Sequence, residues 1–213
     1  MFTYKDVLKD KQIIENYIKI EDKTNYVISH GLIHVKNVLK ICKNIAKEME
    51  LSKQKKRLLC ISAVLHDIGR IEENKKHNFA SEEFAKNYLK DKLNACELEV
   101  VCNAIKYHSQ EYAEFDVMDD VAYCLLLADK LDYQKSRLLK KLMCQATTPH
   151  FNKLKYCDKM IVKKQNNELI VNVYQNNSEM QQIVKDMDRK VLHEILKNFI
   201  LHFKLKDYTF KFI

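Results

Sequence analysis

The sequence predicts a mainly α-helical protein with a small mixed segment near its C-terminal end. The 213 residues include only two Gly and one Pro, so few residues end or bend helices, and helices joined by short connections should dominate. Apolar residues recur at helical spacing over most of the chain. Only after about residue 145 do β-branched residues gather in short runs that are typical of strands.

Helical patterns follow one another over residues 1–145. In the second of them, Leu32, Val35 and Leu39 belong to one apolar stripe, and Ser29 is a candidate N-cap. The expected helices cover residues 4–20, 29–50, 52–67, 79–93, 95–108 and 119–133, and a short basic helix follows to about residue 143.

The helix expected over residues 52–67 is apolar on nearly every side, which indicates a buried central helix. It ends in His66 and Asp67, and Gly69 offers a C-terminal stop. A carboxylate is unfavourable there, because the last turn already carries partial negative charge and burial without a partner costs several kcal/mol more. Either Asp67 is exposed or a cation lies beside it, and we favour a bound metal ion.

The segment from 146 to 213 has a different character. Residues 160–162 and 168–174 flank Gln165-Asn166-Asn167, which predicts a β-hairpin with Asn in the turn. A long amphipathic helix is expected over residues 178–204, and the alternating tail 208–213 could form a last strand. We interpret residues 1–145 as a helical core and residues 146–213 as an appendage packed on it in one structural unit.

Composition and charge narrow the classes of protein. There is no apolar run long enough to span a bilayer and no N-terminal export signal, so we expect a cytoplasmic protein without a membrane partner. Seven Cys form no C-x-x-C pair, as in a reducing compartment. The net charge is +8, and residues 150–213 hold 12 basic against 7 acidic residues, or +5 of it. Because the basic residues form no cluster, we attribute them to solvated surface and expect no nucleic-acid partner, although they would attract a small anionic substrate.

Histidines and aspartates gather at the expected helix ends. Side chains from separate helices can converge at one end of a bundle, whereas a lone His is more often a core or surface residue. Seven residues share such positions: His30, His34, His66, Asp67, His77, His108 and Asp129.

The order of these residues resembles the HD superfamily of metal-dependent phosphohydrolases. Three stretches carry the resemblance: Ser-His-Gly-Leu-Ile-His-Val-Lys-Asn-Val at 29–38, Ala-Val-Leu-His-Asp-Ile-Gly-Arg at 63–70 and Leu-Ala-Asp-Lys-Leu-Asp at 127–132. The resemblance covers about residues 28–133 and implies an HD-type helical bundle. The segment after residue 145 has no counterpart in it.

The resemblance implies four metal ligands, His34, His66, Asp67 and Asp129. Imidazoles and carboxylates suit a divalent ion such as Mn²⁺, Fe²⁺, Zn²⁺, Ni²⁺ or Mg²⁺. One or two such ions would polarise a phosphoryl oxygen and lower the pKa of the attacking water.

The remaining candidates are catalytic groups around these ligands. His77 and His108 either complete a second metal site with Asp67 as the bridge, or contact phosphate and protonate the leaving group. Arg70 and Lys130 are candidates to pair with phosphate oxygens.

For four other histidines and one further aspartate the sequence gives less indication of a role in the site. For His30 the sequence leaves two roles open: a cap or hydrogen bond at the start of its helix, or a part in the site. Asp132 is expected to be a helix-end residue, although its place in Asp-Lys-Leu-Asp would also suit a partner of a ligand. The others are interpreted as structural or surface residues: His150, His193 and His202.

The function predicted from this pattern is hydrolysis of a phosphomonoester or phosphoanhydride bond, with a nucleotide as the substrate. After His66-Asp67 the chain lacks the Glu-Asp pair of alarmone hydrolases, and it has no Gly-Tyr-Pro signature of cyclic di-GMP phosphodiesterases. Two alternatives stay open: a nucleotide- or metal-binding regulatory module without catalysis, and a metal-dependent nuclease. The apolar stripe of the last long helix could face a second subunit, so a homo-oligomer also stays open.

Overall fold

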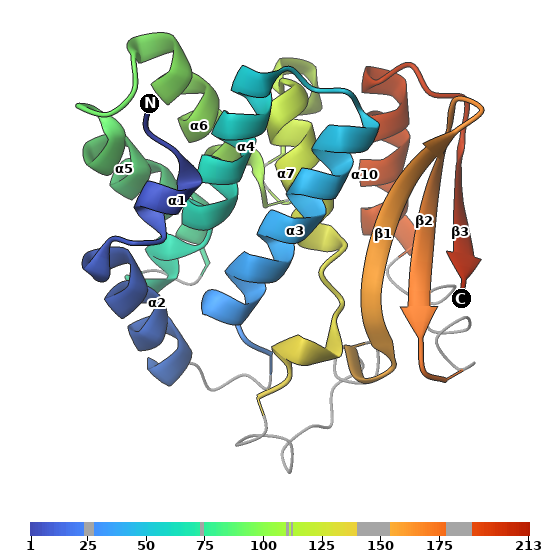
Figure 1. Cartoon of the computed structure of the whole chain (residues 1–213), viewed down its shortest axis with the longest axis horizontal. Helices are drawn as coiled ribbons and strands as arrows, with labels where there is room; N and C mark the ends of the chain where they lie inside the picture. Colours follow the sequence, from blue (N-terminus) through green and yellow to red (C-terminus); the bar gives the residue numbers. More distant parts are fainter. Residues whose placement is uncertain (24–27, 73–74, 110, 112, 140–153, 178–188) are drawn as a thin grey trace.

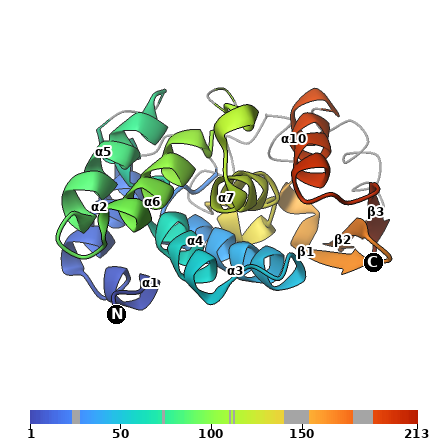
Figure 2. The same ribbon diagram turned by 90° about the horizontal axis from the view of Figure 1, so that it is seen from above.

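The computed structural model describes residues 1–23, 28–72, 75–109, 111, 113–139, 154–177 and 189–213. Four helices that contact one another form the centre of a bundle, and a small sheet with one helix stands at its side (Figure 1). Seen from above, α2 and α5 lie at one end of the molecule and the sheet and α10 at the other, with α3, α4 and α7 between them (Figure 2). The central helices are α3 (Leu32–Glu48), α4 (Lys53–Leu65), α6 (Ala95–Tyr107) and α7 (Asp120–Lys130).

The outer helices and the short 3₁₀ turns complete the helical part. Helix α4 contacts α1, α3, α6 and α7, so every residue from Leu58 to Leu65 is buried, as the sequence predicts for a central helix. Among the described cysteines all are free, and all but Cys96 are buried. The remaining helical elements are α1 (Tyr4–Val7), α2 (Lys11–Lys23), η1 (Ile68–Ile71), α5 (His77–Leu89), η3 (Phe115–Val117), η4 (Lys135–Arg137) and α10 (Arg189–His202).

The single helix predicted over residues 4–20 is wrong. The chain forms α1 and α2 instead, because Asp6 and Thr3 close a capping box around the first turn and Asp10 accepts a hydrogen bond from the Gln12 N–H. A side chain that satisfies a free N–H in this way favours a new helix start.

The predicted N-cap at Ser29 is also wrong, because α3 begins after Gly31. The Ser29 hydroxyl donates to the carboxylate of Glu21, which also accepts the Gly31 N–H. The Ser29 N–H donates to the Arg137 carbonyl. Ser29 therefore ties together three segments instead of capping a helix.

Gly69 has a different role from the predicted helix stop. Helix α4 ends at Leu65, Asp67 precedes the 3₁₀ turn η1, and no glycine has a positive φ. A Cβ on Gly69 would lie 2.4 Å from the Ser81 nitrogen and 2.6 Å from the His77 carbonyl oxygen. Glycine is needed here because α5 packs directly on the backbone.

The segment after α7 differs from the predicted basic helix in its described part. Residues up to 139 form the turn η4 and an isolated bridge between Ile28 and Leu138. Residues 140–143 of that expected helix, the expected boundary at 145/146 and residues 178–188 of the expected long helix lie outside the described residues. Helix α10 is the described remainder of the long helix.

The predicted hairpin and last strand are confirmed. Strands β1 (Cys157–Gln165) and β2 (Glu168–Gln175) pair antiparallel, and Asn166 and Asn167 form the turn with φ values of 52° and 63°. This left-handed pair is the conformation that Asn tolerates in a two-residue hairpin loop. Strand β3 (Tyr208–Phe212) runs parallel to β2, giving the order β1-β2-β3.

The appendage shares one hydrophobic core with the bundle. The Asn44 amide of α3 donates to the Val162 carbonyl at 2.9 Å and accepts the Val162 N–H at 2.7 Å, which fixes β1 on α3. Helix α10 packs on α7, where His202 Nε2 lies 2.7 Å from Asp120 Oδ1. Within the described ranges, no helix combines the length and the apolar character needed to cross a membrane.

Replacing Gly69 with Ala should lower the free energy of unfolding by about 1–3 kcal/mol, the usual cost of overpacking. The new Cβ would meet backbone atoms of Ser81 and His77, which cannot rotate away. Denaturant unfolding measures the change. The matched control is Asn87→Ala, at an exposed position on α5. An equal or larger loss in the control would contradict this role of Gly69.

Candidate metal centre

Residues from five segments converge at the end of the bundle where α4, α6 and α7 end and α3 and α5 begin. Asp67 stands at the centre of this cluster and is only 1% exposed. Three overlapping groups of its side chains bring ligand atoms within 4.8 Å of one another: His30 with His34 and Asp67, His34 with His66 and Asp129, and His66 with Asp67 and His108.

The four ligands implied by the resemblance lie within reach of one ion. His34 Nε2 is 3.1 Å from both His66 Nε2 and Asp129 Oδ1, and 3.5 Å from Asp67 Oδ2. His66 Nε2 is 3.7 Å from each of the two carboxylate oxygens. Ligands placed about 2.1 Å from a common ion are themselves roughly 3.0–3.4 Å apart. The spacing therefore suits a single divalent ion.

The ring orientations leave lone pairs pointing at this centre. The His66 Nδ1–H donates to the Ala63 carbonyl at 3.0 Å, and the His108 Nδ1–H donates to the Ile105 carbonyl at 2.6 Å. A carbonyl only accepts, so Nδ1 carries the proton in both rings and Nε2 presents its lone pair. Lone pairs and carboxylate oxygens that face one another are stabilised by a cation.

The second oxygen of Asp67 faces a second cluster. Asp67 Oδ1 lies 3.2 Å from His77 Nε2 and 3.5 Å from His108 Nε2, and these two nitrogens are 3.1 Å apart. Arg70 Nε stands 2.8 Å from Oδ1, yet neither atom makes a hydrogen bond within the described residues. An oxygen that is buried without a hydrogen bond and faces two imidazole nitrogens is suited to a cation, so Asp67 can bridge two sites.

Both central carboxylates are ionised. Burial by itself would raise the pKa of Asp67, but the Arg70 guanidinium and His66 hold it well below its usual range. Asp129 is similar: burial would raise its pKa, but Lys130, His34 and His66 together hold it well below its usual range. Ionised carboxylates are the form that binds a metal ion.

The imidazoles divide into two electrostatic types. Burial lowers the pKa of His30 to about 3 and lowers the pKa of His108, so both rings are neutral at pH 7. Burial would also lower the pKa of His66, but the charges of Asp67 and Asp129 raise it above its ordinary value. Positive charge is thus favoured at the point where the two carboxylates meet His66.

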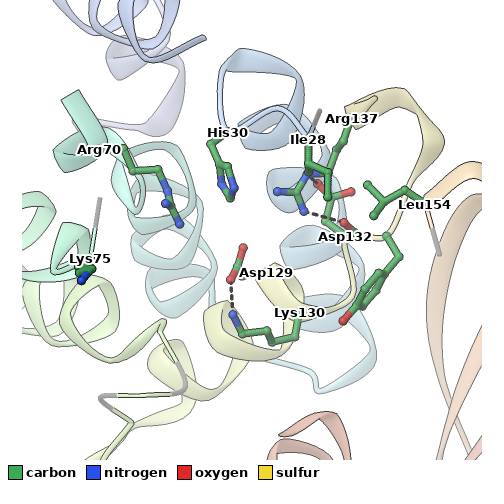
Figure 3. Close-up of a pocket in the computed structure, with 10 residues that line it drawn as sticks. Ile28, His30, Arg70, Lys75, Asp129, Lys130, Asp132, Arg137 and Leu154 are labelled. Carbon is green, nitrogen blue, oxygen red and sulfur yellow. Dashed lines mark hydrogen bonds and ion pairs between the residues drawn. The ribbon is translucent and has the colours of Figure 1, made fainter. Parts of the chain in front are cut away.

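A pocket of about 440 Å³ is lined in part by His30 and Asp129. Figure 3 shows Arg70 and Lys75 on one side of these residues, and Ile28 and Leu154 on the other. One end of the pocket therefore carries two cations, and the other end combines the apolar Ile28 and Leu154 with the Arg137–Asp132 pair (Figure 3). The other lining residues are Lys130 and Tyr133.

Two residues take a larger part in the site than the sequence predicted. Asp132, expected to be a helix-end residue, is 1% exposed and its Oδ2 lies 2.7 Å from His34 Nδ1. His30, left open, has its Nδ1 3.0 Å from Asp67 Oδ2. The second aspartate of Asp-Lys-Leu-Asp was the available signal for Asp132.

Other pocket residues had no signal in the sequence. Arg137 was expected in a basic surface helix, but it is buried and lines the pocket, as does Leu154 of the C-terminal segment. Two of the three histidines that were interpreted as structural or surface residues lie in the described part of the chain, and both lie away from the cluster around Asp67. His202 pairs with Asp120, His193 Nδ1 bonds the Tyr208 hydroxyl, and His150 lies outside the described residues.

Replacing Asp67 with Asn should abolish high-affinity Mn²⁺ binding, because both clusters lose their shared charge. Equilibrium dialysis followed by elemental analysis measures ions bound per chain. Asp116→Asn is the control, since Asp116 is exposed on η3. His108→Ala should bind less Mn²⁺ than the wild type and more than Asp67→Asn. If it binds as much as the wild type, His108 is no ligand.

Comparison with known proteins agrees with this geometry. Residues 31–134 match the family model of the HD domain, a range that includes all four implied ligands. No curated protein matches the chain. Among solved structures, the chain is similar to a predicted HD superfamily hydrolase from an uncultured Thermotogales bacterium. The identity is 18%, the match covers 66% of this chain and 86% of that chain, and the TM-score is 0.47. The chain therefore contains an HD domain over residues 31–134.

Proposed function

We propose that the protein hydrolyses a phosphomonoester or phosphoanhydride bond of a nucleotide. The observation that carries this proposal is the joint placement of two features. Ligand atoms for a divalent ion lie around Asp67. Two of these residues, His30 and Asp129, also line a pocket with cations at one end and apolar side chains at the other. Neither feature alone would separate a hydrolase from a metal-binding module.

In this proposal His34, His66, Asp67 and Asp129 hold the divalent ion. The ion supplies Lewis acidity toward a phosphoryl oxygen and lowers the pKa of the attacking water. The protein fixes its ligands before binding, since three of them are fully or almost fully buried and their rings and carboxylates contact one another. Such preorganisation lowers the cost of ordering the reactive geometry.

Three cations are placed to receive the phosphate. Arg70 and Lys130 line the pocket beside the metal ligands, with Lys130 Nζ 3.1 Å from Asp129 Oδ2 and Arg70 Nε 2.8 Å from Asp67 Oδ1. Lys75 lines the same end of the pocket. A guanidinium can bind two phosphate oxygens at once and stabilise the charge that develops on them.

His77 and His108 suit metal ligation better than proton donation. A general acid would need a proton on the nitrogen that faces the site. His108 keeps its proton on Nδ1, bonded to the Ile105 carbonyl, and His77 Nε2 lies 3.0 Å from Arg70 Nη2, a group that can only donate. His108 Nε2 therefore carries a lone pair near Asp67 Oδ1, whereas the lone pair of His77 Nε2 accepts the Arg70 N–H, so a second ion at this point would replace that hydrogen bond.

The apolar end of the pocket supports a nucleoside as the rest of the substrate. Ile28 and Leu154 lie at that end, opposite Arg70 and Lys75 (Figure 3), and Tyr133 also lines the pocket. Pockets of this kind commonly bind a planar group on apolar and aromatic side chains while a few polar groups fix its orientation. The volume of about 440 Å³ lies in the usual range for small ligands.

The test is turnover of a substrate panel by protein loaded with Mn²⁺ or Fe²⁺. Nucleoside mono-, di- and polyphosphates should be cleaved faster than inorganic pyrophosphate, which has no group for the apolar end. Arg70→Ala should lower kcat/KM by about 10²–10³, the usual cost of removing one charge-stabilising donor. Arg57→Ala is the control, because Arg57 pairs with Glu97 away from the pocket.

Two results would contradict the proposal. Tight nucleotide binding with no turnover under any metal would identify a binding module instead of an enzyme. Equal turnover of pyrophosphate and nucleotides would remove the nucleoside from the proposal while leaving phosphohydrolysis in place.

A further inference from the structure

We propose that Asp132 is a positioning residue that orients His34 for metal binding. This inference rests on the proposed metal centre and adds to it a residue outside the set of four ligands. His34 Nδ1 and Asp132 Oδ2 are 2.7 Å apart, and both side chains are fully buried. His34 therefore has one ring nitrogen on Asp132 and the other, Nε2, facing His66, Asp67 and Asp129.

This contact decides which nitrogen of His34 carries the proton. The Asp132 Oδ2 atom is placed as the acceptor of a hydrogen bond from Nδ1, an arrangement that puts the ring proton on Nδ1 and leaves the lone pair on Nε2. The negative charge beside Nδ1–H also makes the ring a stronger electron-pair donor. Within the described residues, the Asp132 carboxylate bonds His34 and none of the other three proposed ligands, so it would act on the metal through His34.

Asp132 is held in place by its own partners. Gln134 Nε2 donates to Asp132 Oδ1 at 3.0 Å, and Oδ2 lies 2.7 Å from His34 Nδ1 and 3.6 Å from Arg137 Nε. The Arg137 Nη1–H donates to the Asp132 carbonyl at 2.8 Å, and the Arg137 Nε–H donates to the Ser29 carbonyl at 3.1 Å.

The same arginine joins the two segments that carry the pair. The Ser29 N–H donates to the Arg137 carbonyl at 2.8 Å, beside the bridge between Ile28 and Leu138. Ser29 lies just before α3, which carries His34, and Arg137 lies just after Asp132. The chain segments on both sides of the His34–Asp132 hydrogen bond are therefore fixed to each other, so the ring cannot turn without breaking buried hydrogen bonds.

The experiment compares Mn²⁺ affinity of the full chain with that of Asp132→Asn. The amide can donate to Nδ1, which moves the ring proton to Nε2 and blocks the lone pair. We expect Mn²⁺ affinity to fall about 10–100-fold, the usual effect of losing such a partner. At saturating Mn²⁺ the variant should bind as many ions per chain as the wild type, since Asp132 is not one of the proposed ligands. Gln134→Ala is the matched control: it removes the other hydrogen bond of Asp132 and should change affinity far less.

A second readout depends neither on the Asp132 variant nor on turnover. In ¹⁵N-histidine NMR spectra of the Zn²⁺-loaded wild type, the ring identified as His34 by its loss in His34→Gln should keep its proton on Nδ1. A metal on Nδ1, or a proton on Nε2, would overturn the proposal even if Asp132→Asn failed to fold. A folded Asp132→Asn variant with wild-type Mn²⁺ affinity would overturn it as well. If the chain binds Mn²⁺ as proposed but hydrolyses nothing, the proposed function fails while this inference stands.

Discussion

The Asp67 carboxylate is the group on which the rest of the site depends. It is buried where α4 gives way to η1, and its two oxygens face different sets of imidazoles. A buried charge without compensation would destabilise the fold by several kcal/mol. The neighbouring elements therefore bring cations or metal-binding nitrogens to it, and Gly69 lets α5 come close enough for His77 to take part.

The features predicted from the sequence are those that depend on local pattern. Helical periodicity located the central helices, and two Asn between β-branched runs located the hairpin. The order of His34, His66, Asp67 and Asp129 indicated a joint site because it resembles that of the HD superfamily and because side chains at the ends of separate helices can converge. The structure brings all four together, and their role as ligands stays a prediction.

The features that sequence reasoning missed depend on contacts between distant segments. Asp132 lies beyond the last residue of α7, and only the turn that follows brings it to His34. Arg137 is a basic residue in a basic stretch, and its burial follows from carbonyl groups of Ser29 and Asp132 that no local pattern reveals. The role of Gly69 likewise depends on α5, which packs on it from outside its own turn.

The proposed chemistry and the proposed choice of substrate lie on different parts of the chain. All four proposed ligands precede residue 130, whereas Tyr133 and Leu154 line the pocket from the segments that follow. The hydrogen bonds from Asn44 to β1 fix the C-terminal segment on α3, the helix that also carries His34. Changes in the later segments can therefore alter the pocket wall while the metal ligands keep their geometry. Asp132 is the exception, because it lines the pocket and bonds a proposed ligand at the same time.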